Sequence, residues 1–273
     1  MSLGSAAIDA KMRTIDYSGP RHQGGPIGFL IQGDAGTGKT TSLITAITYL
    51  LGTHGKDMPD TMPKVYHIDI DQMGGNLHEE AHEHKVPPEC IKAFQFGGHP
   101  GTDPDAIRVM EQWMRTMAFK LPTPAMWAMD SLSALGEMCM CTVLNNAGRS
   151  GTTPQQQDYL RQMTGIKNLC RTLRALPATH GHVLIAHTDY EKDDVDGRMK
   201  QFLAVTGKLD RQLLREFTEI YNTRVTGSGA QTKYLWRTSA TNNTIARTSL
   251  RLDEEIKQDF AIPLAAWRKH EQK

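Results

Sequence analysis

The sequence has few cysteines, no long apolar runs and almost no net charge. Its 273 residues include four cysteines, at positions 90, 139, 141 and 170. None forms a Cys-x-x-Cys pair and no secretory signal is recognisable, so we expect reduced thiols in a cytosol rather than a disulfide framework. Residues 1–19 have no apolar core of signal-peptide length, and no later segment approaches the roughly 18 apolar residues that span a bilayer. We therefore expect a cytoplasmic protein without a membrane partner.

The charge balance excludes little by itself. The chain has 31 basic and 30 acidic residues and a net charge of +1, with 39% hydrophobic and 22% charged residues. Such a composition is typical of soluble globular proteins rather than disordered or fibrous ones. The net charge of the whole chain therefore gives no indication of a nucleic-acid partner.

The length suits one large α/β domain, which buries enough surface to fold without disulfides. Residues 1–26 are polar and interrupted by glycine and proline, so we expect an N-terminal arm, flexible or oligomerising. The folded domain is expected over residues 27–264, followed by a short C-terminal tail at 265–273.

Short apolar strands alternate with amphipathic helices along the domain. Strands are expected at 27–31, 64–70, 125–129 and 182–186, and helices at 39–51, 104–120, 157–176 and 209–222. Polar residues predict loops at 142–156 and 187–206, and paired strands are expected at 233–238 and 244–251. This alternation predicts an α/β fold whose mostly parallel central sheet carries helices on both faces and a C-terminal antiparallel strand pair.

Ligands of such sheets bind beyond the carboxyl ends of the strands. That rule gathers four segment ends at one rim of the sheet, although they are spread over 155 positions of sequence. The four are Gly33, Asp71, Asp130 and His187.

A glycine-rich loop follows the first strand. Residues 33–40 match G-x-x-x-x-G-K-[ST] at every fixed position, with a strand before them and a helix after them. Backbone N–H groups of such a loop form an anion-binding nest, and the helix adds its positive amino end. The pattern predicts a site for ATP and Mg²⁺ in which Lys39 reaches the β- and γ-phosphates and the Thr40 hydroxyl ligates the metal. The expected nucleotide-binding residues are Gly33, Asp34, Ala35, Gly36, Thr37, Gly38, Lys39, Thr40 and Thr41.

Two further acids are expected to complete this site. Asp130 ends an apolar strand about 90 residues after the loop, where a carboxylate would hold Mg²⁺ directly or through water. No glutamate follows Asp130, so the base that activates water must come from elsewhere, and Asp71 is the candidate. A plain turn aspartate is the competing interpretation for each.

His187 follows the strand that ends at Ala186, and its imidazole can donate a hydrogen bond to a phosphate. A surface histidine without such a role is the alternative.

The segment His78-Glu79-Glu80-Ala81-His82 fits the H-E-x-x-H pattern of zinc proteases. Charged residues flank it on every side, so it lacks the buried apolar face that would hold such a helix in a protease core. We interpret it as a solvated face.

Basic residues cluster in two segments. Residues 161–174 contain four of them and no acid, and residues 211–251 contain seven against two glutamates. These segments could follow a phosphate backbone, or they could be ordinary solvated faces.

Several phrases, in this order, resemble the RecA-like ATPases. They are the phosphate loop, Asp69-Ile70-Asp71, Met129-Asp130-Ser131, Ile185-Ala186-His187, Thr206-Gly207-Lys208-Leu209, and the closing segment through Arg247, Arg251 and Ile262-Pro263. Over residues 27–262 the chain looks most like the small phage proteins that consist of a RecA core alone and act in single-strand annealing. One departure is Asp71, where the family commonly has a glutamate, so the base is shorter by one methylene.

The resemblance implies a P-loop ATPase that hydrolyses ATP in a DNA-stimulated manner, in the host cytoplasm if the protein is phage-encoded. It implies a homo-oligomer, ring or filament, with ATP between subunits and with loops near 137–156 and 187–206 facing single-stranded DNA. It places His187 as a sensor of the γ-phosphate. It also implies a basic residue that reaches the neighbour's γ-phosphate in trans, for which Arg247 is chosen over Arg237 and Arg251.

The function expected first is therefore ATP-dependent binding of single-stranded DNA in phage-type recombination or annealing. A RecA-like ring motor, of the helicase or packaging type, is one alternative. A nucleotide-gated assembly protein that binds no DNA is another.

Overall fold

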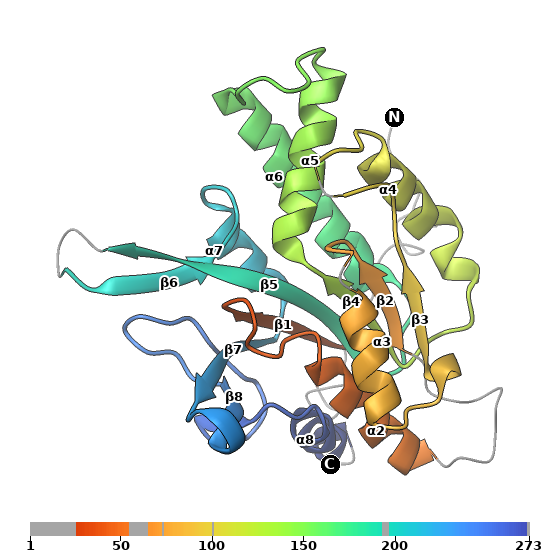
Figure 1. Ribbon diagram of the computed structural model, residues 1–273, viewed down its shortest axis with the longest axis vertical. Helices are drawn as coiled ribbons and strands as arrows, with labels where there is room; N and C mark the ends of the chain where they lie inside the picture. The colour runs from red at the N-terminus through yellow and green to blue at the C-terminus, as the bar shows by residue number, and fades with distance from the viewer. Residues whose placement is uncertain (1–25, 55–64, 73, 100, 193–196, 272–273) are drawn as a thin grey trace, which may run out of the picture.

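A computed structural model of the chain describes residues 26–54, 65–72, 74–99, 101–192 and 197–271 (Figure 1). Within these residues, nine strands form one sheet in the order β3-β2-β4-β5-β1-β7-β8-β9, and β6 pairs with β5 beside this path. The parallel part contains β1 (Ile27–Gly33), β2 (Val65–Asp69), β3 (Ile91–Phe94), β4 (Met126–Asp130), β5 (Gly181–Lys192) and β7 (Glu219–Thr226). Antiparallel pairs add β6 (Met199–Leu203) to β5, and β8 (Lys233–Arg237) and β9 (Glu255–Lys257) to β7.

Helices cover both faces of this sheet (Figure 1). The α-helices are α2 (Ser42–His54), α3 (Gly74–Glu83), α4 (Ala106–Thr116), α5 (Leu132–Asn146), α6 (Gln156–Ala175), α7 (Leu209–Leu213) and α8 (Ala261–Glu271). Short 3-10 turns lie at Pro88–Cys90, Ala118–Lys120, Leu214–Glu216 and Gly229–Gln231.

Strand β1 contributes side chains to two apolar clusters, one on each face of the sheet. Leu30 packs with residues of α4 to α7, whereas Phe29 and Ile31 pack with residues of α2, α3 and α8. Successive side chains of a strand point to opposite faces, so a strand covered on both faces is mostly apolar, and the one polar side chain of β1, Gln32, donates a hydrogen bond to the Ile245 carbonyl. All seven of its residues are buried. The fold class expected from the sequence is confirmed.

Two expected elements are wrong because tertiary pairing overrides local pattern. The helix expected at 209–222 stops at Leu213, and β7 begins at Glu219, where Phe29 to Gln32 of β1 offer a pairing edge. The loop expected at 187–206 is instead a β-hairpin, because β5 runs on to Lys192 and pairs with β6.

Three other boundaries also differ from the sequence prediction. The loop expected at 142–156 is helical up to Asn146 in α5. Residues 244–251 do not form a strand, and their pairing with the sheet in the described structure is one isolated β-bridge between Ile220 and Arg247. The tail expected from residue 265 is helical to Glu271, because Trp267 of α8 is only 6% exposed in the core. The arm expected at 1–26 lies outside the described residues apart from Pro26, and its role remains a prediction.

None of the helices in the described ranges is both long and apolar enough to cross a membrane.

Candidate functional site

The glycine-rich loop lies between β1 and α2, as expected. Gly38 has φ +77°, a conformation that side chains with a Cβ rarely adopt. Position 33 must be glycine because of close packing: a Cβ at this position would lie 1.8 Å from the Thr223 hydroxyl oxygen. The Thr223 hydroxyl is also 2.6 Å from the Thr37 hydroxyl, so a hydrogen bond joins β7 to the loop.

Lys39 lies inside this loop, with only 5% of its surface exposed. Its ammonium donates hydrogen bonds to the carbonyl oxygens of Gly33, at 2.9 Å, and Asp34, at 2.6 Å. Burial lowers the pKa of Lys39, although the nearby carboxylates, Asp130 first, oppose the shift. The ammonium is therefore a concentrated positive charge at the centre of an anion-binding turn.

Asp130 ends β4 beside the loop and accepts a hydrogen bond from the Thr40 hydroxyl. Burial raises the pKa of Asp130 to about 6, and the hydrogen bond from Thr40 works against that rise. A hydroxyl and a carboxylate oxygen side by side are the hard ligands that Mg²⁺ takes in phosphate-binding sites, where substrate oxygens and water supply the rest. The chemistry of this pair fits the metal expected from the sequence.

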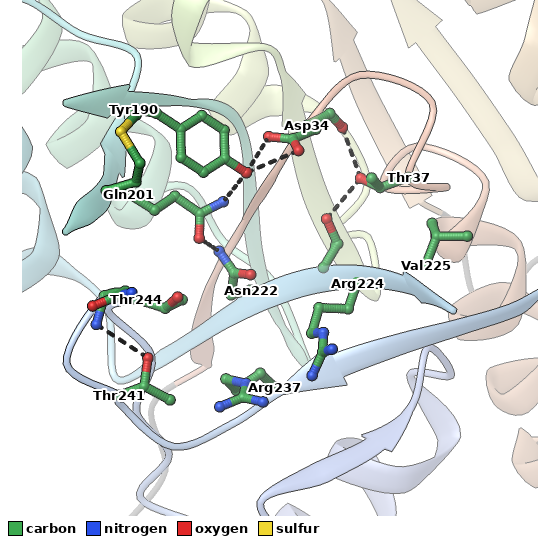
Figure 2. Close-up of a pocket in the computed structure, with 13 residues that line it drawn as sticks. Asp34, Thr37, Tyr190, Gln201, Asn222, Arg224, Val225, Arg237, Thr241 and Thr244 are labelled. Atoms are coloured by element: carbon green, nitrogen blue, oxygen red, sulfur yellow. Dashed lines mark hydrogen bonds between the residues drawn. The ribbon is translucent and has the colours of Figure 1, made fainter. Parts of the chain in front are cut away.

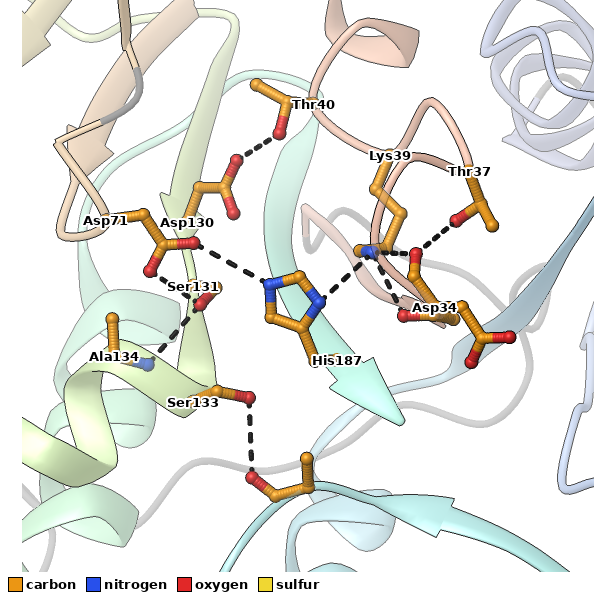
Figure 3. Close-up of polar contacts among 12 residues, drawn as sticks. Asp34, Thr37, Lys39, Thr40, Asp71, Asp130, Ser131, Ser133, Ala134 and His187 are labelled. Carbon is orange, nitrogen blue, oxygen red and sulfur yellow. Dashed lines mark hydrogen bonds and ion pairs between the residues drawn. The ribbon is translucent and has the colours of Figure 1, made fainter. Parts of the chain in front are cut away.

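Asp71 and His187 face each other next to this pair (Figure 3). Asp71 Oδ2 lies 3.8 Å from His187 Nε2, and the Ser131 hydroxyl donates to Asp71 Oδ1 at 2.8 Å. Burial alone would raise the pKa of Asp71, but the hydrogen bonds from His187 and Ser131 outweigh it and hold the pKa below its ordinary value. Asp71 is thus an ionised, fixed carboxylate.

His187 continues the chain of contacts toward the loop, since its Nδ1 lies 3.5 Å from Lys39 Nζ. The structure therefore brings Lys39, Thr40, Asp71, Asp130 and His187 together at one rim (Figure 3). They come from the loop, from the carboxyl ends of β2 and β4, and from within β5, where His187 pairs with Gly33 at the end of β1.

Arg247 is not part of this group within its own chain. Its guanidinium donates to the carbonyl oxygens of Leu214, at 2.5 Å, and Phe217. Phe217 precedes β7, which runs parallel to β1, so these carbonyls lie near the opposite end of the strands from the loop.

The hairpin of β5 and β6 is bonded directly to the phosphate loop. The Tyr190 hydroxyl donates to the Asp34 carboxylate at 2.9 Å and the Thr188 hydroxyl does so at 2.8 Å. Gln201 of β6 donates to Thr188 at 3.0 Å and accepts from Asn222 of β7 at 2.7 Å. Asp34, Tyr190 and Gln201 line one side of a pocket of about 650 Å³, which Arg224 and Arg237 line from the other side (Figure 2).

Sequence reasoning missed two features of this rim. His67 of β2 is 1% exposed, its Nε2 lies 4.0 Å from Asp130 Oδ2, and neither ring nitrogen has a hydrogen-bond partner among the described residues. A histidine in the middle of an apolar strand was the available signal. The partners of the Asp34 side chain had no local signal, because Tyr190 is 156 positions away.

Several of the basic residues expected to form a nucleic-acid surface are paired within the chain, although Arg171 and Arg224 remain about half exposed. On α6, Arg171 pairs with Glu216 at 2.9 Å and Arg174 donates to the Glu216 carbonyl. Arg224 and Arg237 share the Glu255 carboxylate at 2.6 and 2.7 Å. These four side chains therefore have structural partners.

The His78–His84 segment lies on α3 and the turn after it, where His84 pairs with Glu80 at 3.8 Å. Within the described ranges, no group of three or more histidine, cysteine, aspartate or glutamate side chains is arranged to hold a metal ion.

No protein-family model matches the sequence, and no curated protein matches it. Among solved structures, the flagellar accessory protein FlaH from Methanocaldococcus jannaschii aligns over 85% of this chain and 85% of its own, with a TM-score of 0.41 and 14% identity. A KaiC-like protein from Pyrococcus horikoshii aligns over 82% of this chain and 83% of its own, with a TM-score of 0.42 and 12% identity. Likenesses of this size carry no functional conclusion.

Proposed function

We propose that this protein binds ATP with Mg²⁺ at the loop Gly33–Thr40 and hydrolyses it. One observation carries the proposal: the buried Lys39 ammonium lies in the glycine-rich turn, beside the hydrogen-bonded pair of Thr40 and Asp130. A buried cation next to hard oxygen ligands, at the amino end of a helix, is an arrangement that binds a phosphate chain and its metal.

Each residue of the rim has a task in this proposal. Lys39 binds the β- and γ-phosphate oxygens, and Thr40 and Asp130 hold Mg²⁺, which when bound neutralises charge that develops on the phosphates. Asp71, kept ionised by its hydrogen bonds, takes the proton of the attacking water. His187, between Asp71 and Lys39, donates to the γ-phosphate.

The second part of the proposal is that single-stranded DNA binds on the side of the β5–β6 hairpin and stimulates turnover. Support comes from the hairpin's hydrogen bonds to Asp34, which give a surface element direct contact with the phosphate loop. The phage-type annealing role, the host-cytoplasm location and a homo-oligomer with ATP between subunits rest on the sequence resemblance. In that assembly Arg247 acts on the neighbour's nucleotide.

A nucleotide-gated assembly protein without DNA binding is the second candidate. The pairing of Arg171, Arg174, Arg224 and Arg237 within the chain favours it, because paired guanidinium groups contribute less to a phosphate-binding surface.

Steady-state ATP turnover with and without single-stranded DNA tests both candidates, together with DNA binding titrated with salt. We expect Lys39→Ala to abolish turnover and DNA to raise it in the native protein, with an affinity that falls as salt rises. Turnover that persists in Lys39→Ala rejects the ATPase proposal. Turnover without DNA binding or stimulation at low salt rejects the DNA partner and favours the assembly protein, whereas ATP-driven unwinding of a tailed duplex would indicate a ring motor.

A further inference from the structure

A second pocket, of about 730 Å³, adjoins the phosphate loop on the side of α2. Its lining includes Gly38 and Thr41 of the loop, Tyr234 and Leu235 of β8, and Gln258, which follows β9. This volume is within the range of small-ligand sites, about 300–1,000 Å³. None of the five residues assigned to phosphate chemistry lines it, although Gly38 and Thr41 neighbour them in sequence.

Tyr234 and Gln258 are fixed directly on the loop. A Cβ built on Gly38 would lie 3.0 Å from Gln258 Oε1 and 3.2 Å from Tyr234 Cδ1, so both side chains rest on the loop backbone. The Gln258 backbone N–H donates to the Tyr234 carbonyl at 3.1 Å. The Phe260 N–H donates to the Thr45 hydroxyl at 2.9 Å, which ties the segment after β9 to α2.

The side chains of Tyr234 and Gln258 differ in their exposure to solvent. Tyr234 lies on the same face of β8 as the buried Trp236, yet 44% of Tyr234 is exposed, so its ring forms an open wall of the pocket. Gln258 is only 7% exposed, and its Nε2 has no hydrogen-bond partner within the described part of the chain. A buried amide donor without a partner is costly, so native proteins seldom keep one without a use.

We propose that this pocket holds the nucleoside of the bound nucleotide, with Tyr234 stacking on the base and Gln258 reading its edge. The inference rests on the proposed function, because the phosphates must lie in the loop for the base to reach Gln258. A carboxamide offers one donor and one acceptor, the pattern that pairs with N7 and the N6 amine of adenine. Gln258 is therefore the specificity residue for adenine over guanine.

Calorimetric titration of the full chain with three ligands in Mg²⁺ buffer tests the proposal: ATP, GTP and inorganic tripolyphosphate, which has no base. We expect Tyr234→Ala and Gln258→Leu each to weaken ATP binding roughly tenfold, which is the size of one stacking or hydrogen-bond contribution, and to change tripolyphosphate binding less than about twofold. Gln258→Leu also brings the affinities for ATP and GTP together. Tyr234→Phe retains the ring and should lose less ATP affinity than Tyr234→Ala.

Tyr159→Ala and Gln157→Leu on the exposed surface of α6 are the matched controls, and the thermal midpoint of every variant verifies folding. Unchanged ATP affinity in Tyr234→Ala and Gln258→Leu overturns the nucleoside pocket, and so does an equal loss of ATP and tripolyphosphate. If the native protein and Lys39→Ala bind neither ATP nor tripolyphosphate, the phosphate site itself fails and the pocket proposal falls with it. Failure of the nucleoside pocket and failure of the phosphate site thus give different patterns of ATP and tripolyphosphate binding.

Discussion

The two acids that flank the phosphate loop have opposite environments. Asp130 is buried and its pKa is raised to about 6, whereas hydrogen bonds from His187 and Ser131 outweigh burial and lower the pKa of Asp71. Carboxyl groups whose pKa values are driven apart usually have separate tasks. Under the proposed function, Asp130 would gain most from the bound Mg²⁺, and Asp71 would stay ionised and able to accept a hydrogen bond from the attacking water.

Replacing Asp71 tests this division of tasks. Asp71→Asn should lower kcat for ATP hydrolysis by about 10²–10³, the usual contribution of a general base, and change the Kd for ATP by less than about twofold. Single-turnover kinetics and calorimetry measure the two quantities. Asp105→Asn is the control, since Asp105 pairs with Arg108 on the surface. An equal loss of binding and rate would show that Asp71 positions the nucleotide instead.

His182 of β5 makes stability depend on pH. Burial lowers its pKa to about 4, although the hydrogen bond with the Leu176 carbonyl at 2.8 Å opposes the shift. Because the folded-state pKa is below the unfolded value of 6.5, the unfolded chain binds the extra proton first, and stability is lost as pH falls from 6.5 toward 4. This one group should cost about 2 kcal/mol of unfolding free energy between pH 7 and pH 5.

Urea unfolding of His182→Gln at pH 7 and pH 5 measures that contribution. We expect a smaller difference between the two pH values than in the native protein, even if the variant is less stable at both. His82→Gln on the exposed face of α3 is the control. A native-like difference in His182→Gln would assign the pH dependence to other groups.

At the level of elements, the β5–β6 hairpin connects the sheet to the phosphate loop. Strand β5 carries both His187 and Tyr190, so one strand contacts both Lys39 and Asp34 of the loop. Any shift of the loop on nucleotide binding therefore reaches the hairpin through the same strand.

Tyr190→Phe removes the hydroxyl that donates to Asp34 and should weaken the coupling between the β5–β6 hairpin and the phosphate loop. Hydrogen exchange of residues 188–192 and 199–203 measures this, with and without ATP. In the native protein we expect ATP to change the exchange of these amides several-fold, and in Tyr190→Phe we expect most of that change to vanish, since a hydrogen bond to a charged group contributes about 1.5–3 kcal/mol. Tyr159→Phe on α6 should behave like the native protein. A full ATP response in Tyr190→Phe would mean that the coupling does not need the Tyr190 hydroxyl and runs through Thr188 or His187.

The buried parallel strands and the phosphate loop could be predicted because their signals are local. A strand covered on both faces reads as an unbroken apolar run, as in β1, β4 and the first half of β5. The hairpin could not be predicted, since both of its faces are largely exposed and no apolar alternation marks it. β7 was missed because Leu209, Leu213 and Phe217 repeat at helical spacing, and only pairing with the edge of β1 makes the next segment a strand.

The same reasoning applies to the site. That Lys39, Thr40, Asp71, Asp130 and His187 lie together could be predicted, because each stands in the loop pattern or at the end of a strand expected from the sequence. The partners of Asp34, Gly38 and Asp130 could not, because Tyr190, Gln258 and His67 reach them through the folded sheet.

At the level of the whole molecule, the proposed assembly makes Arg247 a shared residue. Within the chain its guanidinium binds the carbonyls of Leu214 and Phe217, so action on a neighbour's phosphate requires release from them.

Mixing variants separates the two roles. Lys39→Ala subunits retain Arg247 but cannot turn over ATP, and Arg247→Ala subunits retain the loop. If Arg247 acts in trans, Arg247→Ala alone should lose about 10³-fold in turnover and regain activity when mixed with Lys39→Ala subunits. Arg251→Ala and Arg237→Ala, mixed in the same way, are the rivals. Native turnover by Arg247→Ala would leave only the structural role, seen as a lower thermal midpoint.

The burial of the cysteines makes site-directed labelling practical in this protein. Cys90, Cys139 and Cys170 are buried, and burial raises the pKa of the Cys139 and Cys170 thiols, so few of their sulfurs exist as reactive thiolate. Met199, half exposed on the hairpin, is a position where an introduced thiol would react far faster with a maleimide dye. Only Cys141, which is partly exposed, would have to be replaced before a dye at Met199→Cys could report nucleotide binding through the hydrogen bonds between hairpin and loop.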